Sequence, residues 1–97
     1  MYLKIHSSPE GEIVALCDEE LIGRVLRDGK MCLDLKVHGA FYKGEKVSQA
    51  RAVAALSEAR NANLVGVRSL EAAKKAGLSV SGAVLISGIP HLQMYRI

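Results

Sequence analysis

The chain of 97 residues has no tryptophan and no threonine, and it contains only two cysteines, Cys17 and Cys32. Two thiols are too few for the dense disulfide framework of a small secreted domain. No apolar run approaches the roughly 20 residues that a membrane helix needs. The stretch Met1–His6 is already charged, unlike a secretion signal. These absences favour the reducing cytoplasm, no membrane contact, and two thiols packed as small apolar groups.

What the chain does have is the composition of a globular protein, with 49% hydrophobic and 24% charged residues. Its length fits one domain over residues 1–97. The hydrophobic residues are spread along the chain, which excludes intrinsic disorder. The sequence contains no internal repeat, and nothing in it indicates an oligomeric state.

Charge is distributed unevenly along the chain, whose net charge is +3. Residues 1–35 carry four basic and seven acidic groups, whereas residues 36–97 carry nine basic and three acidic groups. This asymmetry is compatible with one basic face that attracts phosphate. It is equally compatible with an ordinary solvated surface.

The first half predicts an antiparallel hairpin, made by strands at residues 2–6 and 13–17 around a turn at Pro9–Gly11. Asp18 is a suitable N-cap for a helix over residues 19–28, with Gly29 as its C-terminal stop. Residues 31–38 then alternate between apolar and polar side chains, which is typical of a half-exposed strand.

The second half begins with a loop over residues 39–46. Ser48 is a suitable cap for the alanine-rich helix that follows, and Ser69 for the next. The expected elements are a helix at 49–60, a strand at 64–67, a helix from Ser69 to Lys75 stopped by Gly77, a buried strand at 83–86 and a tail at 91–97.

These elements predict an α+β (mixed α/β) fold in a single compact domain. We expect a mixed five-stranded sheet with an N-terminal antiparallel hairpin and about three helices. Residues 64–86 form the pattern strand–helix–strand, which predicts a parallel βαβ unit at the C-terminus.

Metal and cofactor chemistry find little support in the sequence. The candidate metal ligands are scattered singly, without the paired spacing of a zinc site: His6, Cys17, Cys32, His38 and His91. The chain has neither a P-loop nor a dinucleotide-binding glycine motif. Cys17 closes an apolar strand, so burial is favoured over nucleophilic catalysis. We therefore expect no metal and no cofactor, and no catalytic residue is assigned.

Nucleic-acid binding is indicated by two features. Phe41 and Tyr42 precede Lys43 in the predicted loop, and aromatic rings beside basic groups hold single-stranded RNA. Phe41 is expected in the core and Tyr42 at the surface. Arg68 and Ser69 stand at a helix N-terminus that could bind a phosphate or could simply be capped. The predicted nucleic-acid contacts are Lys36, Tyr42, Lys43, Lys46, Arg60 and Arg68.

Two polar clusters are the candidates for a small-ligand or enzymatic site. Asn61 and Asn63 stand before one predicted strand, and His91 and Gln93 follow another. His91 would be the natural acid–base group. The alternative interpretation of the asparagines is that they cap the end of a helix. The alternative interpretation of the second cluster is a rigid turn at Pro90, in which His91 has no functional role. A shared site requires Asn63 and His91 to lie close together.

With these motifs, the chain resembles the small archaeal family catalogued as domain of unknown function 424. The resemblance is carried by residues 17–23, 41–45, 61–66 and 88–93, in the family's order and over nearly the whole chain. It implies a compact archaeal cytoplasmic protein and no particular reaction, and it associates the chain with translation. The tail from Met94 to Ile97 extends past the last motif and has no assigned role.

The leading hypothesis is therefore a non-enzymatic RNA- or ribosome-associated accessory protein linked to translation. The alternative is a small-ligand-binding or enzymatic domain with a site at Asn61/Asn63 or His91/Gln93. A protein–protein adaptor is the third class, with no specific feature in its favour.

Overall fold

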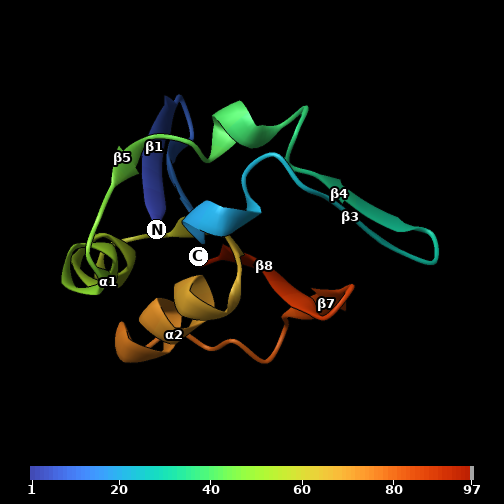
Figure 1. Ribbon diagram of the computed structural model, residues 1–97. Coiled ribbons are helices and arrows are strands. Elements are labelled where there is room, and N and C mark those ends of the chain that lie inside the picture. Colours follow the sequence, from blue (N-terminus) through green and yellow to red (C-terminus); the bar gives the residue numbers. More distant parts are fainter. Residues whose placement is uncertain (97) are drawn as a thin grey trace.

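The chain is built on a six-stranded mixed sheet, in a computed structural model that describes residues 1–96 (Figure 1). From one edge to the other, the strand order is β5-β1-β2-β6-β8-β7. In chain order the strands are β1 (Tyr2–Ser8), β2 (Gly11–Cys17), β5 (Glu45–Lys46), β6 (Asn61–Val65), β7 (Val84–Ile86) and β8 (Ile89–Tyr95).

Only one neighbouring pair in this sheet is parallel. β1 and β2 form the predicted antiparallel hairpin, and β5 pairs antiparallel with β1. β2 and β6 run parallel at the centre, and β8 lies antiparallel between β6 and β7. The sheet therefore joins an N-terminal and a C-terminal antiparallel half along the β2–β6 pair.

Two helices, α1 (Gln49–Ser57) and α2 (Val67–Lys75), pack against one face of the sheet (Figure 1). The Ser48 hydroxyl accepts a hydrogen bond from the Arg51 amide, which confirms the predicted cap of α1. Strand residues with alternate spacing, including Leu16 and Leu64, are fully buried in this helix layer. We call this surface the helix face of the sheet.

The opposite face is covered in part by the irregular segment 18–47. This segment contains two short 3-10 helices, η1 (Glu19–Leu21) and η2 (Gly39–Phe41). Between them, β3 (Val25–Asp28) and β4 (Met31–Asp34) form a hairpin that projects from the domain (Figure 1). A second core forms beneath the segment from Ala15, Cys17, Leu21, Leu26, Leu35, Tyr42, Val65 and Ile86.

The predicted helix over residues 19–28 is wrong, because only η1 forms and the chain then becomes extended. Gly23 has φ +91° and its amide donates to the Leu35 carbonyl, so the chain leaves the helical path there. Gly29, with φ +60°, occupies the two-residue loop of the β3–β4 hairpin instead of stopping a helix. A two-residue loop with glycine in its first position is typical of a type II′ hairpin turn, so Gly29–Lys30 could have indicated this turn.

The predicted parallel βαβ unit over residues 64–86 is also wrong. The predicted tail supplies β8, which inserts between β6 and β7. Ser87 and Gly88 both have positive φ in the two-residue turn of the β7–β8 hairpin, as a type I′ turn requires. The predicted buried strand is an exposed edge, with Leu85 60% accessible. Ile97, the end of the predicted tail, lies outside the described residues.

The compact α+β fold with a mixed sheet is confirmed, whereas the counts of elements are corrected. Within residues 1–96 the structure has six strands in the main sheet, two in the projecting hairpin, and two α-helices, instead of five strands and about three helices. Cys17 is buried as expected, but Cys32 is exposed on β4. In the same described range, no helix has the length and apolar character to cross a membrane.

Candidate functional site

Part of the sheet surface opposite the helices is left uncovered by the segment 18–47. It forms a hollow of about 310 Å³ that we call the open face. Its lining is Ile13, Phe41, Asn61, Ala62, Asn63, Gln93, Met94 and Tyr95. Three of the four predicted ligand-binding residues, Asn61, Asn63 and Gln93, therefore lie in one hollow, and we call these three the amide patch.

Strand alternation in β6 explains why the two asparagines lie on the open face. Successive side chains of a strand point to opposite faces of its sheet. Ala62 and Leu64 belong to the core under the helices, so Asn61 and Asn63 point the other way. Both carboxamides consequently lie on the side of the sheet that the helices leave free.

The same alternation in β8 brings Gln93 to the asparagines. Its neighbours Leu92 and Met94 pack in the helix layer, which leaves Gln93 on the opposite face. The antiparallel register sets Asn63 opposite Gln93. Directly opposed residues have Cβ atoms about 5 Å apart, so the three carboxamides form one continuous group.

Asn63 is held in a fixed orientation by two donors. The Tyr42 hydroxyl donates to its side-chain oxygen at 2.6 Å, and His91 Nε2 donates to the same oxygen at 2.9 Å. An amide oxygen accepts two hydrogen bonds and donates none, so the contact places a proton on His91 Nε2. Among residues 1–96, no group accepts from the Asn63 amide nitrogen, and its two N–H donors are left for a ligand on the open face.

The requirement for a shared site is therefore met, because Asn63 and His91 are in hydrogen-bond contact. The titratable side chains in this region, His91, Tyr42 and Cys17, are electrically neutral near pH 7. Burial lowers the pKa of His91, and burial also raises the pKa of Tyr42. Burial, with a contribution from Asp18, raises the pKa of the nearby Cys17 thiol to about 12. The arrangement supplies fixed hydrogen-bond donors and no ionised nucleophile.

Two aromatic rings border the amide patch. Phe41 stacks on His6, with ring centroids 4.3 Å apart, and His6 Nε2 donates to the Phe41 carbonyl. Tyr95 stands at the other side and is 72% exposed. Sequence reasoning missed Tyr95 because it lay in the predicted tail. The alternation of Leu92 and Met94 with polar residues is the period-2 signal that could have revealed the strand.

The predicted surface role of Tyr42 is wrong. Tyr42 is only 3% exposed, packs in the second core and donates inward to Asn63, so its ring is closed to stacking by a base. Phe41, expected in the core, packs against that core but also lines the open face. The core role expected of Phe41 is therefore confirmed in part, and only Tyr42 departs from the role that the sequence suggested.

The predicted open helix end at Arg68 and Ser69 is also corrected. The residue that precedes α2 is Gly66, and the buried carboxylate of Asp18 closes the helix N-terminus. Asp18 accepts from the Arg68 and Ser69 amides at 3.0 and 2.8 Å, and from the Ser69 hydroxyl at 2.8 Å. A phosphate would have to displace this carboxylate, so the site is already filled.

The predicted phosphate contacts are distributed over several elements of the fold. Lys46 and Arg68 pair with Glu19 and Glu20 of η1 at 3.1 and 3.0 Å. The hydrogen bond between Lys46 and Glu19 lowers the pKa of Glu19. Arg60 precedes β6 whereas Arg68 follows it, so these arginines lie toward opposite ends of that strand. Lys36 and Lys43 are exposed on the segment 18–47.

The described part of the chain contains no cluster of potential metal ligands. There, no group of three or more His, Cys, Asp or Glu side chains could hold a metal ion. His91 and Cys17 contact other partners, namely the Asn63 oxygen and the Asp18 carbonyl. The open face offers hydrogen-bonding carboxamides and bordering aromatic rings.

Comparison with known proteins adds a family and a second structure. The family model described as a protein of unknown function (DUF424) matches residues 5–97. The crystal structure of an uncharacterized conserved protein from Methanopyrus kandleri is similar, with a TM-score of 0.85 and 28% sequence identity. That match covers 99% of this chain and 90% of the other. The search of curated proteins gave no match.

Proposed function

The chain belongs to the DUF424 family of proteins of unknown function, and we propose that it is a non-enzymatic RNA-binding module that holds unpaired bases on its open face. The observation that carries this proposal is the fixed amide of Asn63. Its oxygen is occupied by Tyr42 and His91, so its nitrogen presents donors to the hollow. A ligand that fits must offer an acceptor there.

The rest of the amide patch favours a planar ligand with donors and acceptors on one edge. Asn and Gln side chains each carry an acceptor oxygen and two N–H donors. They form paired hydrogen bonds with the edges of nucleobases. Unpaired bases in RNA also stack on exposed aromatic rings, and Tyr95 and Phe41 border the patch. The hollow of about 310 Å³ accommodates such a group.

The neutral state of His91, Tyr42 and Cys17 supports binding without catalysis. General acid–base catalysis is most efficient when the pKa lies near the working pH. Burial moves the pKa of Cys17 far above that range and that of His91 below its usual value. The net charge of +3 supports attraction to a polyanion. Location in the cytoplasm and association with the ribosome or with translation remain predictions.

The test is titration of a fluorescent single-stranded RNA of mixed sequence with the protein at two salt concentrations. We expect binding that weakens steeply between about 50 mM and about 200 mM salt, because phosphate contacts release counterions. Gln93→Ala should weaken binding about ten-fold, the usual effect of one lost specific base contact. Gln49→Ala is the matched control, since Gln49 lies on α1.

Absence of binding at the lower salt concentration would refute the proposal. Equal affinities of the wild type and Gln93→Ala would refute the assignment to the open face. A free nucleoside or nucleotide is the second candidate ligand, favoured by the small hollow and by the Asn63–His91 contact. Competition distinguishes the two ligands. If a free nucleotide displaces the labelled oligonucleotide as strongly as unlabelled RNA does, the site does not require a polynucleotide.

A further inference from the structure

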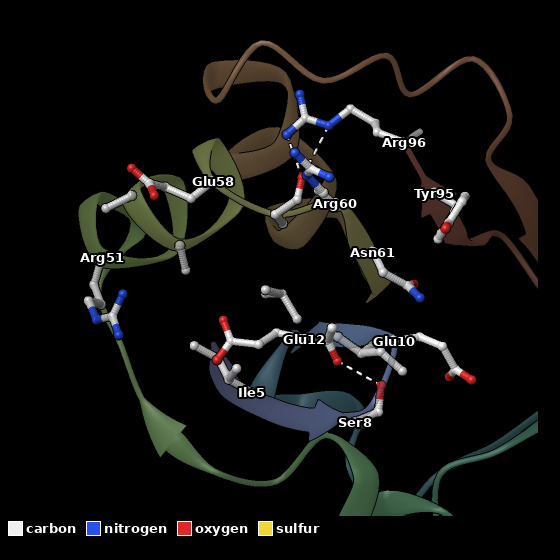
Figure 2. Close-up of a pocket in the computed structure, with 16 residues that line it drawn as sticks. Ile5, Ser8, Glu10, Glu12, Arg51, Glu58, Arg60, Asn61, Tyr95 and Arg96 are labelled. Carbon is white, nitrogen blue, oxygen red and sulfur yellow. Dashed lines mark hydrogen bonds between the residues drawn. The ribbon is translucent and has the colours of Figure 1, made fainter.

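A second and larger hollow adjoins the open face. It is a groove of about 610 Å³ between α1, the β1–β2 hairpin and the ends of β6 and β8 (Figure 2). Asn61, Tyr95 and Ile13 line both hollows. We call it the arginine groove, after Arg60 and Arg96. A ligand seated on the amide patch can therefore continue into the arginine groove without leaving the surface.

The hairpin side of the arginine groove and the side formed by the ends of β6 and β8 carry opposite charge, whereas the α1 side contributes one charge of each sign, Arg51 and Glu58 (Figure 2). Glu10 and Glu12 belong to the β1–β2 hairpin and line one side. Arg60 and Arg96, which flank Asn61 and Tyr95 in sequence, line the other side. An anionic group that enters the groove is thus drawn toward the end of β6 and repelled from the hairpin.

Arg60 and Arg96 are brought together by the backbone. The Arg96 amide donates to the Arg60 carbonyl at 2.7 Å, one position beyond the Asn61–Tyr95 pair. Both side chains carry positive charge, and like charges that lie close together repel each other. Among residues 1–96, neither guanidinium forms an ion pair with a carboxylate. A bound anion would relieve this repulsion.

The guanidinium of Arg96 is also preorganised. Its Nε and Nη2 atoms both donate to the Ala59 carbonyl, which follows the end of α1 (Figure 2). A guanidinium has five N–H donors, so the remaining ones are available to an anion. A planar, fixed guanidinium is well suited to phosphate, because it donates two parallel hydrogen bonds.

We propose that Arg60 and Arg96 bind the phosphate of the nucleotide whose base occupies the amide patch. This inference rests on the proposed function, and it adds an orientation for the bound RNA. The base lies over Asn61, Asn63 and Gln93, and the phosphate lies at the end of the sheet. The acidic side of the groove keeps the phosphate there.

The experiment compares a nucleoside with its monophosphate, followed by NMR titration of the protein at low salt. We expect the monophosphate to bind about ten-fold more tightly, as one or two charge-assisted hydrogen bonds provide. Arg60→Gln should abolish this preference, so that the nucleoside and its monophosphate bind with equal affinity. Arg96→Lys, which keeps the charge but loses the planar fork, should reduce the preference.

Arg51→Gln is the matched control, because it removes the same charge from the same groove but on α1, away from Asn61 (Figure 2). With labelled RNA, Arg60→Gln should also lower the salt slope of binding by about one. Thermal unfolding of each variant verifies that the fold is retained. Of the two groove arginines, Arg60 is the one whose substitution should disturb the fold least, because among residues 1–96 its side chain forms no hydrogen bond, whereas that of Arg96 does.

The outcomes separate the two proposals. If the nucleoside binds and the phosphate adds nothing, or if Arg60→Gln retains the preference, the phosphate site is refuted and base recognition stands. If neither the nucleoside nor RNA binds, base recognition itself is refuted. If the monophosphate binds through Arg60 while Gln93→Ala has no effect, the groove holds an anion independently, and the base assignment fails.

Discussion

The two faces of the central sheet differ most clearly along β6, where neighbouring residues serve opposite purposes. Ala62 and Leu64 are 1% and 0% exposed beneath the helices. Asn61 and Asn63, on the same strand, line a solvent-open hollow. The helix face is closed by two regular helices, whereas the opposite face is closed only where the segment 18–47 reaches. The structure thus separates a face that holds the fold together from a face that presents polar groups.

This separation predicts that substitutions on the two faces have different consequences. Burial of apolar side chains dominates folding stability, and the helix face contains most of it. Gln93, an exposed polar residue of the amide patch, contributes little to stability, whereas Asn63 also accepts the hydrogen bond of the buried Tyr42 hydroxyl. Four predictions test this contrast, and the first has the largest expected effect.

Leu16→Ala should destabilise the protein severely. Leu16 is completely buried in the helix layer, and truncation of a buried leucine costs about 2–5 kcal/mol. Gln93→Ala, on the open face, should change the free energy of unfolding by no more than about 0.5 kcal/mol. Urea denaturation measures both. Comparable losses in the two variants would contradict the contrast between the faces.

Asp18→Ala should cost about 2 kcal/mol, because it removes the cap of α2 and leaves buried donors without an acceptor. The carboxylate accepts hydrogen bonds from the Arg68 and Ser69 amides and from the Ser69 hydroxyl. Asp18→Asn keeps one acceptor oxygen and should lose less. Urea denaturation followed by the helical circular dichroism signal measures the effect. Unchanged stability of Asp18→Ala would show that solvent replaces the carboxylate.

Asp18 also shows where sequence reasoning succeeds and where it fails. The sequence correctly marks Asp18 as a helix cap, but of the wrong helix, since its partners lie about 50 positions later. The local sequence shows that a residue can cap a helix, but it does not show which helix is capped when that helix is distant in sequence. In the same way, Gly66 adopts φ +110° with the Asp18 carboxylate so close that no Cβ fits. Only the assembled fold shows that requirement.

The sequence predicted which residues belong to the candidate site, but it did not predict how the fold brings them together. Asn61, Asn63 and Gln93 were selected from the sequence and do line one hollow. Their meeting depends on β8, whose alternating pattern after Pro90 was interpreted as a tail. The strand order of a sheet is set by long-range pairing, so β8 could not be placed between β6 and β7 from local patterns. The burial of Tyr42, which the sequence placed at the surface, also depends on contacts with residues distant in sequence.

Tyr42→Phe should have a smaller effect on stability and a clear effect on binding. The substitution removes the hydroxyl that donates to Asn63, which costs about 1 kcal/mol. With one of its two donors gone, the Asn63 amide is free to turn, so RNA affinity should fall several-fold. Tyr95→Phe is the matched control, because Tyr95 is 72% exposed and keeps its stacking ring. Denaturation and RNA titration of both variants decide the matter, and equal RNA affinities would argue against an orienting role for Tyr42.

The smallest expected effect is the dependence of stability on pH through His91. Burial lowers the pKa of His91 in the folded protein below its usual value near 6.5. The unfolded chain therefore binds more protons than the folded chain in this range, and stability increases with pH. The contribution should be complete above the unfolded pKa and decline as pH falls through it toward the folded pKa.

His91→Gln should remove this contribution, since glutamine does not titrate and can still donate to the Asn63 oxygen. Urea denaturation at about pH 7.5 and about pH 5.5 brackets the usual histidine pKa. His6 and His38 are present in both proteins, so their titration is shared and the difference between the two pH profiles isolates His91. A wild-type profile that runs parallel to that of the variant would mean that solvent reaches the imidazole, and the Asn63 contact would then be open to water as well.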